Sequence, residues 1–207
     1  RGFIVKHIVQ QLGDNSNSLQ WEPIVAVELI HAASLIIDDF GYRNDHVSNG
    51  FLQLPGKLTY AIIPGHDYSQ LFSKKAYDAG YEIIVHLPME NIGKTYGEEE
   101  YVLMSYFQDD EIKNRINKAF DYLPESIGLN NHQGSRGTAD SRVMTLVAGV
   151  IKEKNKFFID SRTANNSLAE TTMRKYGVPT NKRDIFLDNE LDEEKIKIRN
   201  DAALLNI

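Results

Sequence analysis

The sequence contains no cysteine and no long apolar run, and each absence excludes a class of protein. Without cysteine there can be no disulfide bridge, no thiolate zinc site and no cysteine nucleophile. Glycine and proline are also modest, at 14 and 6 of 207 residues, which excludes collagen-like and low-complexity chains. No segment is apolar over the length that crossing a bilayer requires.

Positive charge is the scarcer sign. The sequence has 23 Lys and Arg against 29 Asp and Glu, a net charge of −6, and no basic run. This balance argues against a nucleic-acid-binding groove and hence against nucleic acid as a partner. The length fits one domain, or one domain with a small appendage, and is sufficient to bury a core.

Short apolar runs that end in polar residues alternate with amphipathic stretches from about residue 35 onward. The runs are 35–39, 58–63, 82–86, 126–132, 156–161 and 183–189, and the helical patterns are 69–80, 109–124, 139–155, 167–177 and 191–205. This alternation predicts parallel βαβ units, and about six of them favour an α/β barrel over an open sheet. Residues 1–34 do not follow this alternation, which predicts that they form a small N-terminal appendage to a domain over 35–207. Ser69 and Gly80 are expected to cap the helix 69–80 at its two ends.

Polar side chains collect where the predicted strands end. Five runs finish in Asp38-Asp39, His86, Asn130-Asn131-His132, Asp160-Ser161 and Asp188-Asn189. The carboxyl ends of parallel strands meet at one edge of the sheet, which we call the mouth, so these groups should gather there. We expect Asp38, Asp39, His86, His132 and Asp160 to lie within about 10 Å of one another, roughly two strand spacings.

The residue types at this edge are those of a metal site. One Asp and two His from different strands form the N/O ligand set of a catalytic zinc or similar divalent ion. Asp160 and Arg162, close together after one strand, are suited to orienting a ligating histidine. Glu90 follows His86 by four residues, but Pro88 disfavours a helical turn there, which makes Glu90 a weaker ligand candidate. Taken singly, each motif also fits a plain turn or a core histidine.

Several blocks, in this order, resemble the divergent polysaccharide deacetylase family, a distant relative of the NodB-type carbohydrate esterases. They are IIDDFGY, AGYEIIVHLPME, IGLNNHQGSR, FFIDSRT and IFLDNE. The resemblance covers roughly residues 35–200. It implies a deformed (β/α) barrel of about six to seven parallel strands and metal-dependent removal of an acyl group, typically N-acetyl, from a glycan. It also implies an extracytoplasmic protein, secreted or periplasmic.

Carried over by position, the resemblance makes Asp38 the general base and makes Asp39 and His86 ligands of a divalent metal, with zinc preferred. Glu90 stands where the NodB-type relatives have a second ligating histidine. We therefore favour His132 as the third ligand, because it ends the next strand at the same mouth.

The remaining candidates are assigned to the surroundings of the ligands. Asp160 and Arg136 join Asp38 in the catalytic set, where they would orient the ligands, and Glu90, Asn131, Ser135 and Arg162 are expected to bind substrate or support the site. Among these, Asn131 and Ser135 are the candidate donors to the oxyanion.

The relatives close with a further strand, whose Gly-His-Pro-like segment carries a histidine in the position of the catalytic acid. The sequence ends at Ile207, before such a strand, so we expect a barrel that is incomplete at its C-terminus and completed in a longer natural protein. A glycan-binding pseudoenzyme of the same fold is the main alternative. A phospho-acceptor domain fits less well, because His86 and Asp160 stand where it needs an aspartate and a lysine.

Overall fold

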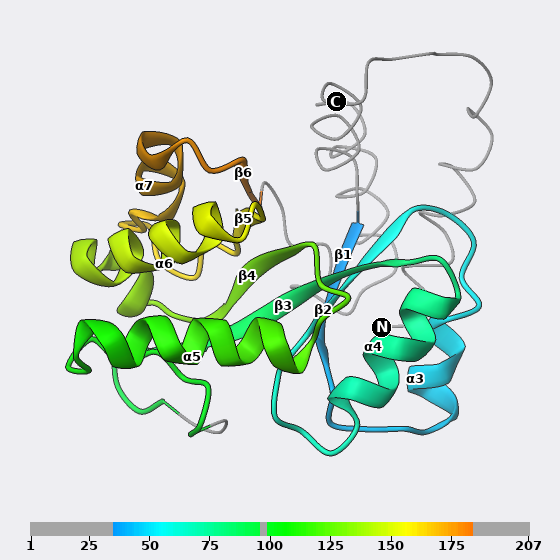
Figure 1. Ribbon diagram of the computed structural model, residues 1–207. Coiled ribbons are helices and arrows are strands. Elements are labelled where there is room, and N and C mark those ends of the chain that lie inside the picture. Colours follow the sequence, from blue (N-terminus) through cyan, green and yellow to red (C-terminus); the bar gives the residue numbers. More distant parts are fainter. Residues whose placement is uncertain (1–34, 96–98, 184–207) are drawn as a thin grey trace, which may run out of the picture.

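The computed structural model describes residues 35–95 and 99–183, in which six strands alternate with helices (Figure 1). The strands are β1 Leu35–Phe40, β2 Leu58–Ile62, β3 Glu82–Met89, β4 Gly128–Gln133, β5 Phe157–Asp160 and β6 Thr180–Lys182. The helices are α3 His46–Phe51, α4 Ser69–Asp78, α5 Asp109–Tyr122, α6 Ser141–Glu153 and α7 Ala169–Tyr176, with a 3-10 turn, η2, at Gly137–Ala139. The predicted appendage over 1–34 and the predicted helix over 191–205 lie outside these residues.

The strands form one parallel sheet whose spatial order, β1 to β6, is also their order in the sequence. The sheet curls into a half-barrel, so the fold is the deformed (β/α) barrel that the sequence predicted. Helices α4 to α7 each pack against a strand that flanks them in the sequence. Among the described strands, β1 pairs only with β2 and β6 only with β5, so these six do not close a barrel.

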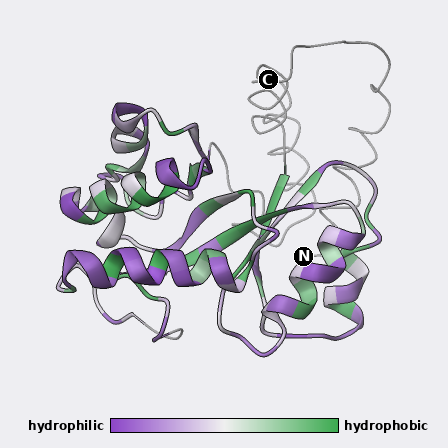
Figure 2. Ribbon diagram, in the orientation of Figure 1, coloured by the Kyte–Doolittle hydropathy of each residue, from purple (hydrophilic) through white to green (hydrophobic). Residues whose placement is uncertain are grey.

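Helices α4 to α7 each bury a set of mainly apolar residues, and Figure 2 shows apolar and polar residues mixed along their length. In α5 the predicted stripe is buried at Ile112, Ile116, Ala119 and Phe120. Three acidic residues occupy the first turn of the same helix, where negative charge interacts favourably with the helix dipole. Predicted and observed bounds of α4 to α7 agree within two residues, which is the ordinary uncertainty of helix ends.

An aromatic cluster fixes the end of β1 against its neighbours. The ring of Phe40 stacks on Phe72 of α4 with centroids 4.1 Å apart, and meets Tyr60 of β2 edge to face at 5.0 Å. Such ring pairs add about 0.5–1.5 kcal/mol each beyond the burial of their area. Because Phe40 follows directly after the two aspartates, this packing anchors the backbone that presents them.

Two caps differ from simple sequence expectation. Helix α3 has no counterpart among the predicted helices; Asp45 caps it by accepting hydrogen bonds from the backbone N–H groups of Val47 and Ser48. The N-cap of α4 is Tyr68 and not Ser69, whose hydroxyl donates to the carbonyl of Ile63 at 2.6 Å instead. Asp45 thus defines the start of α3, whereas α4 begins without a side-chain cap.

The last described strand, β6, has no counterpart among the predicted strands. The apolar run 183–189 predicted a strand, whereas β6 occupies Thr180–Lys182 and Arg183 follows it outside any strand. Residues 184–189, with the predicted strand end Asp188-Asn189, lie outside the described range. The polar side chains of β6 are half-buried, so its pairing with β5 and not its hydrophobicity defines this strand.

Replacing Gly65 by alanine should destabilise the protein by about 1–3 kcal/mol, since overpacking and strain add at this position. Gly65 has φ of +95°, and a Cβ there would lie 2.6 Å from the ring of Tyr101. The matched control is Gly149→Ala in α6, where a Cβ meets nothing within 4 Å. Because alanine favours a helix, this variant should gain about 0.5–1 kcal/mol. The midpoints of urea unfolding measure both changes, provided that the dependence of the unfolding free energy on urea concentration stays the same. Equal midpoints for the two variants would contradict the prediction.

Candidate metal centre

Strand β1 ends in a bulge that presents two adjacent carboxylates on one side. Its register with β2 is regular up to Ile37 and resumes, shifted, at Phe40, so Asp38 and Asp39 lie in the irregular part. Adjacent residues of a regular strand point to opposite faces, and a bulge removes this constraint. Asp39 has φ of +65°, a left-handed conformation that aspartate tolerates better than most residues.

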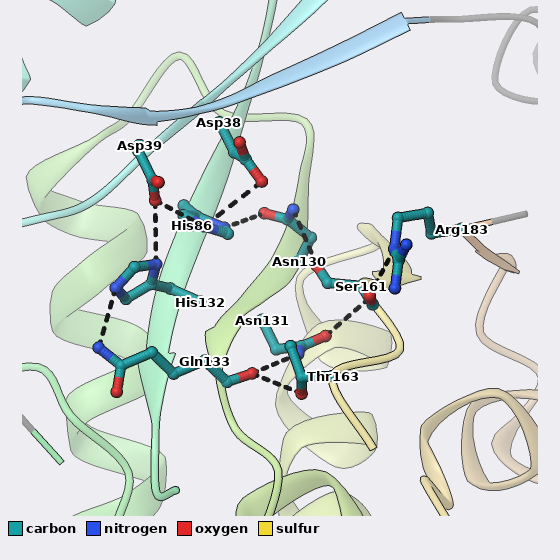
Figure 3. A network of polar contacts seen from close by, with 10 residues as sticks. All are labelled: Asp38, Asp39, His86, Asn130, Asn131, His132, Gln133, Ser161, Thr163 and Arg183. Carbon is teal, nitrogen blue, oxygen red and sulfur yellow. Dashed lines mark hydrogen bonds and ion pairs between the residues drawn. The ribbon is translucent and has the colours of Figure 1, made fainter. Parts of the chain in front are cut away.

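The carboxylate of Asp39 lies between two imidazole rings from neighbouring strands (Figure 3). Its Oδ1 is 3.1 Å from Nδ1 of His132 and 3.4 Å from Nε2 of His86. The candidate ligand atoms of these three residues all lie within 4.8 Å of one another. Asp38 is more distant, with Oδ2 at 3.9 Å from Nε2 of His86, and its side chain is 49% exposed.

The charge of this group suits a divalent cation. The imidazole of His132 first, and that of His86 second, hold the pKa of Asp39 well below its usual range, although burial opposes them. Asp39 is therefore ionised at neutral pH. One carboxylate and two imidazoles form an N/O donor set that fits zinc or a similar ion, and three protein ligands leave a position for water or substrate.

A buried amide sets the orientation of His86. Nδ1 of His86 lies 2.8 Å from Oδ1 of Asn130, the residue directly opposite it in the register of β3 and β4. An amide oxygen can only accept, so Nδ1 carries the hydrogen and, in the neutral ring, Nε2 keeps its lone pair toward Asp39. Asn130 in turn donates from Nδ2 to Oγ of Ser161 at 3.3 Å. The sequence places Asn130 at the right strand end but does not assign it this role.

A second amide contacts the outer nitrogen of His132. Nε2 of Gln133 lies 3.1 Å from Nε2 of His132, and Oε1 of Gln133 accepts from Nδ2 of Asn91 at 2.6 Å. In this arrangement Gln133 donates and Nε2 of His132 accepts, so the neutral ring carries its hydrogen on Nδ1, beside Asp39. Gln133 itself has φ of +57° at the end of β4.

Other predicted residues hold the loops of the mouth together. The carboxylate of Asp160, 2% exposed, accepts from the backbone N–H of Arg162 at 2.8 Å and from Oγ of Ser167 at 2.7 Å. Asn131 accepts from the backbone N–H of Ser161 at 2.9 Å and donates to the carbonyl of Gln133 at 2.8 Å. Asp160 thus binds the loop that follows its own strand, and Asn131 connects the end of β4 to the loop after β5.

Glu90, Ser135 and Arg136 belong to a separate group, where the loops after β3 and β4 meet. Glu90 accepts from the backbone N–H of Ser105 at 2.6 Å, and Nε of Arg136 lies 3.5 Å from its other oxygen. The hydroxyl of Ser135 accepts from the backbone N–H of Ile92 at 2.8 Å. Among the described residues the metal-ligand group contains His132 and not Glu90.

Arg183 is a functional candidate for which the sequence offers no signal beyond its charge. It follows β6, and its guanidinium donates from Nε to the carbonyl of Ser161 at 2.7 Å and from Nη2 to the carbonyl of Arg162 at 3.1 Å. Figure 3 shows it on the β5 side of the polar network, with Asp38 on the β1 side.

Comparison with known proteins identifies relatives by sequence. A family model described as divergent polysaccharide deacetylase matches residues 35–205. The uncharacterised protein YibQ of Escherichia coli (strain K12) is 32% identical over 182 residues, which cover 88% of this chain and 55% of YibQ. An uncharacterised protein of Haemophilus influenzae is 31% identical over 171 residues, covering 83% of this chain and 60% of that protein. The chain spans little more than half the length of these relatives.

Two solved structures share the fold. An uncharacterised protein from Agrobacterium tumefaciens C58 has a TM-score of 0.74 at 19% identity, covering 84% of this chain and 72% of that one. A putative cellobiose-phosphate cleavage protein from Enterococcus faecalis V583 has a TM-score of 0.55 at 15% identity, covering 83% and 75%. Identities this low support the fold alone. Within residues 35–95 and 99–183, no helix combines the length and the hydrophobicity of a membrane span.

Removing the amide of Asn130 should weaken metal binding without removing a ligand. Asn130→Ala is expected to lower the affinity for Zn²⁺ by about 10–100-fold, because His86 loses the acceptor that fixes its tautomer. The control is Asn165→Ala, an exposed asparagine of the loop before α7. Titration against a chromophoric chelator measures the dissociation constant for Zn²⁺ of each variant. An Asn130→Ala affinity equal to that of the control would show that His86 is oriented by other contacts.

Proposed function

Because this chain belongs to the divergent polysaccharide deacetylase family, we propose that it is a metal-dependent hydrolase that removes N-acetyl groups from a polysaccharide or cell-wall glycan. The observation that carries this proposal is the convergence of Asp39, His86 and His132, with the exposed carboxylate of Asp38 beside them. The family's glycan chemistry also leads us to propose an extracytoplasmic location. These proposals concern the whole protein, since the chain spans only 55% and 60% of the length of the two relatives.

The three ligands would hold a divalent ion, for which zinc is our choice because the donors are one carboxylate and two imidazoles. When bound, such an ion supplies Lewis acidity, which polarises a carbonyl and lowers the pKa of water. Asn130, which accepts from Nδ1 of His86, would leave the Nε2 lone pair of that ring available to the ion. Asp39 contributes the negative charge and, through its contacts with both rings, sets the spacing of the ligands.

Asp38 would act as the general base. Its carboxylate lies at the same mouth as Asp39, yet it is the more exposed of the two and contacts only His86 among the ligands, at 3.9 Å. A carboxylate in that position can accept a proton from an attacking water while Asp39 remains committed to the ion. The β1 bulge is what permits these separate roles for adjacent residues.

The other predicted residues would act by positioning. Asn131 and Ser135, the expected oxyanion donors, already bind neighbouring backbone groups, so we assign them to fixing the loops that border the mouth. Asp160 would stabilise the loop after β5. Arg136 with Glu90 would stabilise the loops after β3 and β4, where a glycan chain would pass.

A glycan-binding protein of the same fold without turnover is the alternative. It is supported by the hydrogen bonds that Asn131 and Ser135, the expected oxyanion donors, already make with neighbouring backbone groups. The two functions differ in whether acetate is released when metal and glycan are both present.

Substitutions at the mouth should separate metal binding from turnover. Asp39→Ala and His86→Ala should each lose most bound metal, since a site with three ligands rarely survives the loss of one. Asp38→Asn should retain the metal and lose acetate release, because its carboxamide cannot accept the proton. Metal content per chain and acetate released from chito-oligosaccharides are the two measurements.

Asp78→Asn, an exposed residue of α4 that pairs with Lys74, is the control for loss of one carboxylate and should change neither measurement. Equal metal loss in the Asp38, Asp39 and His86 variants would make Asp38 a ligand. Metal binding by the unmodified protein without any acetate release would favour the glycan-binding alternative.

A further inference from the structure

Two aromatic rings lie together at the surface, where the loops after β1 and β2 meet. The ring centroids of Tyr42 and His66 are 3.8 Å apart, and the ring planes are tilted by 40°. Tyr42 is 48% exposed and His66 is half-buried. We call this pair the aromatic platform. The chemistry proposed for the metal centre uses neither side chain.

Close contact between the two loops brings the rings together. The carbonyl of Gly41 accepts from the backbone N–H of Tyr68 at 3.1 Å. Gly41 has φ of +128°, and a Cβ there would lie 2.5 Å from the hydroxyl oxygen of Ser69 and 3.4 Å from Cβ of His66. Glycine permits both this backbone conformation and this approach. The next residue, Tyr42, is thereby held beside His66.

The loop after β2 is also fixed from its other side. The backbone N–H of His66 donates to Oγ of Ser69 at 3.2 Å, and its carbonyl accepts from the hydroxyl of Tyr122 in α5 at 3.3 Å. Gly65 lies against the ring of Tyr101, as a Cβ there would be 2.6 Å from it. The platform is therefore already formed, and a ligand would not have to order these loops on binding.

The platform lies beside the metal centre. β1 and β2 are neighbours in a parallel sheet, so the loops that follow them leave from the same edge. Tyr42 follows Asp39 by three residues, which limits the distance between their Cα atoms to about 11 Å. β2 also lies between β1, which carries Asp39, and β3, which carries His86. A disaccharide can span the distance from the ligands to the platform.

An exposed aromatic ring is suited to binding a sugar ring. The two faces of a pyranose carry C–H groups, while most of its hydroxyls lie around the rim. Stacking one face on an aromatic ring therefore removes apolar surface from water and leaves the hydroxyls hydrated. Ligand sites commonly combine such apolar contacts with a few polar groups that fix orientation. Here the metal centre would supply the polar groups.

We propose that the aromatic platform binds the sugar next to the N-acetylated one, so that the substrate is a chain of at least two sugars and not a free acetamido sugar. This inference rests on the proposed function, because it places the acetamide at the metal ligands. The ring of Tyr42, the more exposed of the pair, contacts the face of the neighbouring sugar, and His66 supports that ring.

Calorimetric titration tests the platform without turnover. The full chain carrying Asp38→Asn is titrated with chitotetraose and with N-acetylglucosamine in the presence of Zn²⁺. Adding Tyr42→Ala should weaken chitotetraose binding by roughly three- to tenfold, because one aromatic contact is lost. The affinity for N-acetylglucosamine should stay unchanged, because the single sugar occupies the ligands. His66→Ala should weaken chitotetraose binding by a smaller factor.

Two further variants separate stacking from a general effect on the fold. Tyr42→Phe keeps the ring without its hydroxyl and should retain most of the affinity for chitotetraose. Tyr77→Ala is the matched control, since Tyr77 is 57% exposed at the other end of α4, where the chain leads to the start of β3. It should bind both ligands as the parent protein does.

Unchanged chitotetraose binding in Tyr42→Ala would overturn the inference, as would an equal loss in Tyr77→Ala. An equal loss for N-acetylglucosamine would overturn it too, because the acetamido sugar itself would then occupy the platform. Acetate release by the unmodified chain together with any of these results would leave the proposed function intact. Loss of chitotetraose binding in Tyr42→Ala, without acetate release by the unmodified chain, would support the platform and favour the glycan-binding alternative.

Discussion

The bulge at the end of β1 is the constraint on which the site depends. Without it, Asp38 and Asp39 would point to opposite faces of the sheet, and only one carboxylate could reach the mouth. A left-handed residue such as Asp39 costs on the order of 1–3 kcal/mol and persists only where its surroundings enforce it. Here the ring packing of Phe40 holds the backbone, and the contacts with His86 and His132 hold the side chain.

Left-handed residues also follow or end two other strands at the mouth. Gln133 at the end of β4 and Arg162 after β5 are also left-handed, so three strands turn sharply where their polar groups emerge. Behind the ligands the supporting groups are mainly neutral amides, with Asn130 the one that meets His86. An amide orients an imidazole without adding charge, whereas a carboxylate partner would also raise its basicity. The charge of the ligand set therefore comes from Asp39 alone.

The alternation of elements could be predicted because strands and helices differ in period and because parallel strands bring their carboxyl ends to one edge. That reasoning placed Asp39, His86 and His132 together. It could not distinguish an amide from a carboxylate as the partner of His86, since this depends on register across β3 and β4. Nor could it find the bulge, helix α3 or the place of Arg183, which depend on hydrogen bonds between a few residues and not on any periodicity.

The contact between His132 and Gln133 fixes which side chains donate and which accept in the adjoining row of hydrogen bonds. As it stands, hydrogen bonds run from Asn91 to Gln133 and from Gln133 to Nε2 of His132. A cation on Nδ1 would displace the hydrogen there, so that Nε2 becomes the donor and needs an oxygen opposite it. Gln133 must then turn its amide over, and Asn91 must offer it an oxygen in place of Nδ2, although Oδ1 of Asn91 now accepts from the hydroxyl of Ser135 at 3.3 Å. Metal binding would thus change the hydrogen bonds of the loop after β3, through the orientation of the Gln133 amide and the contacts of Asn91.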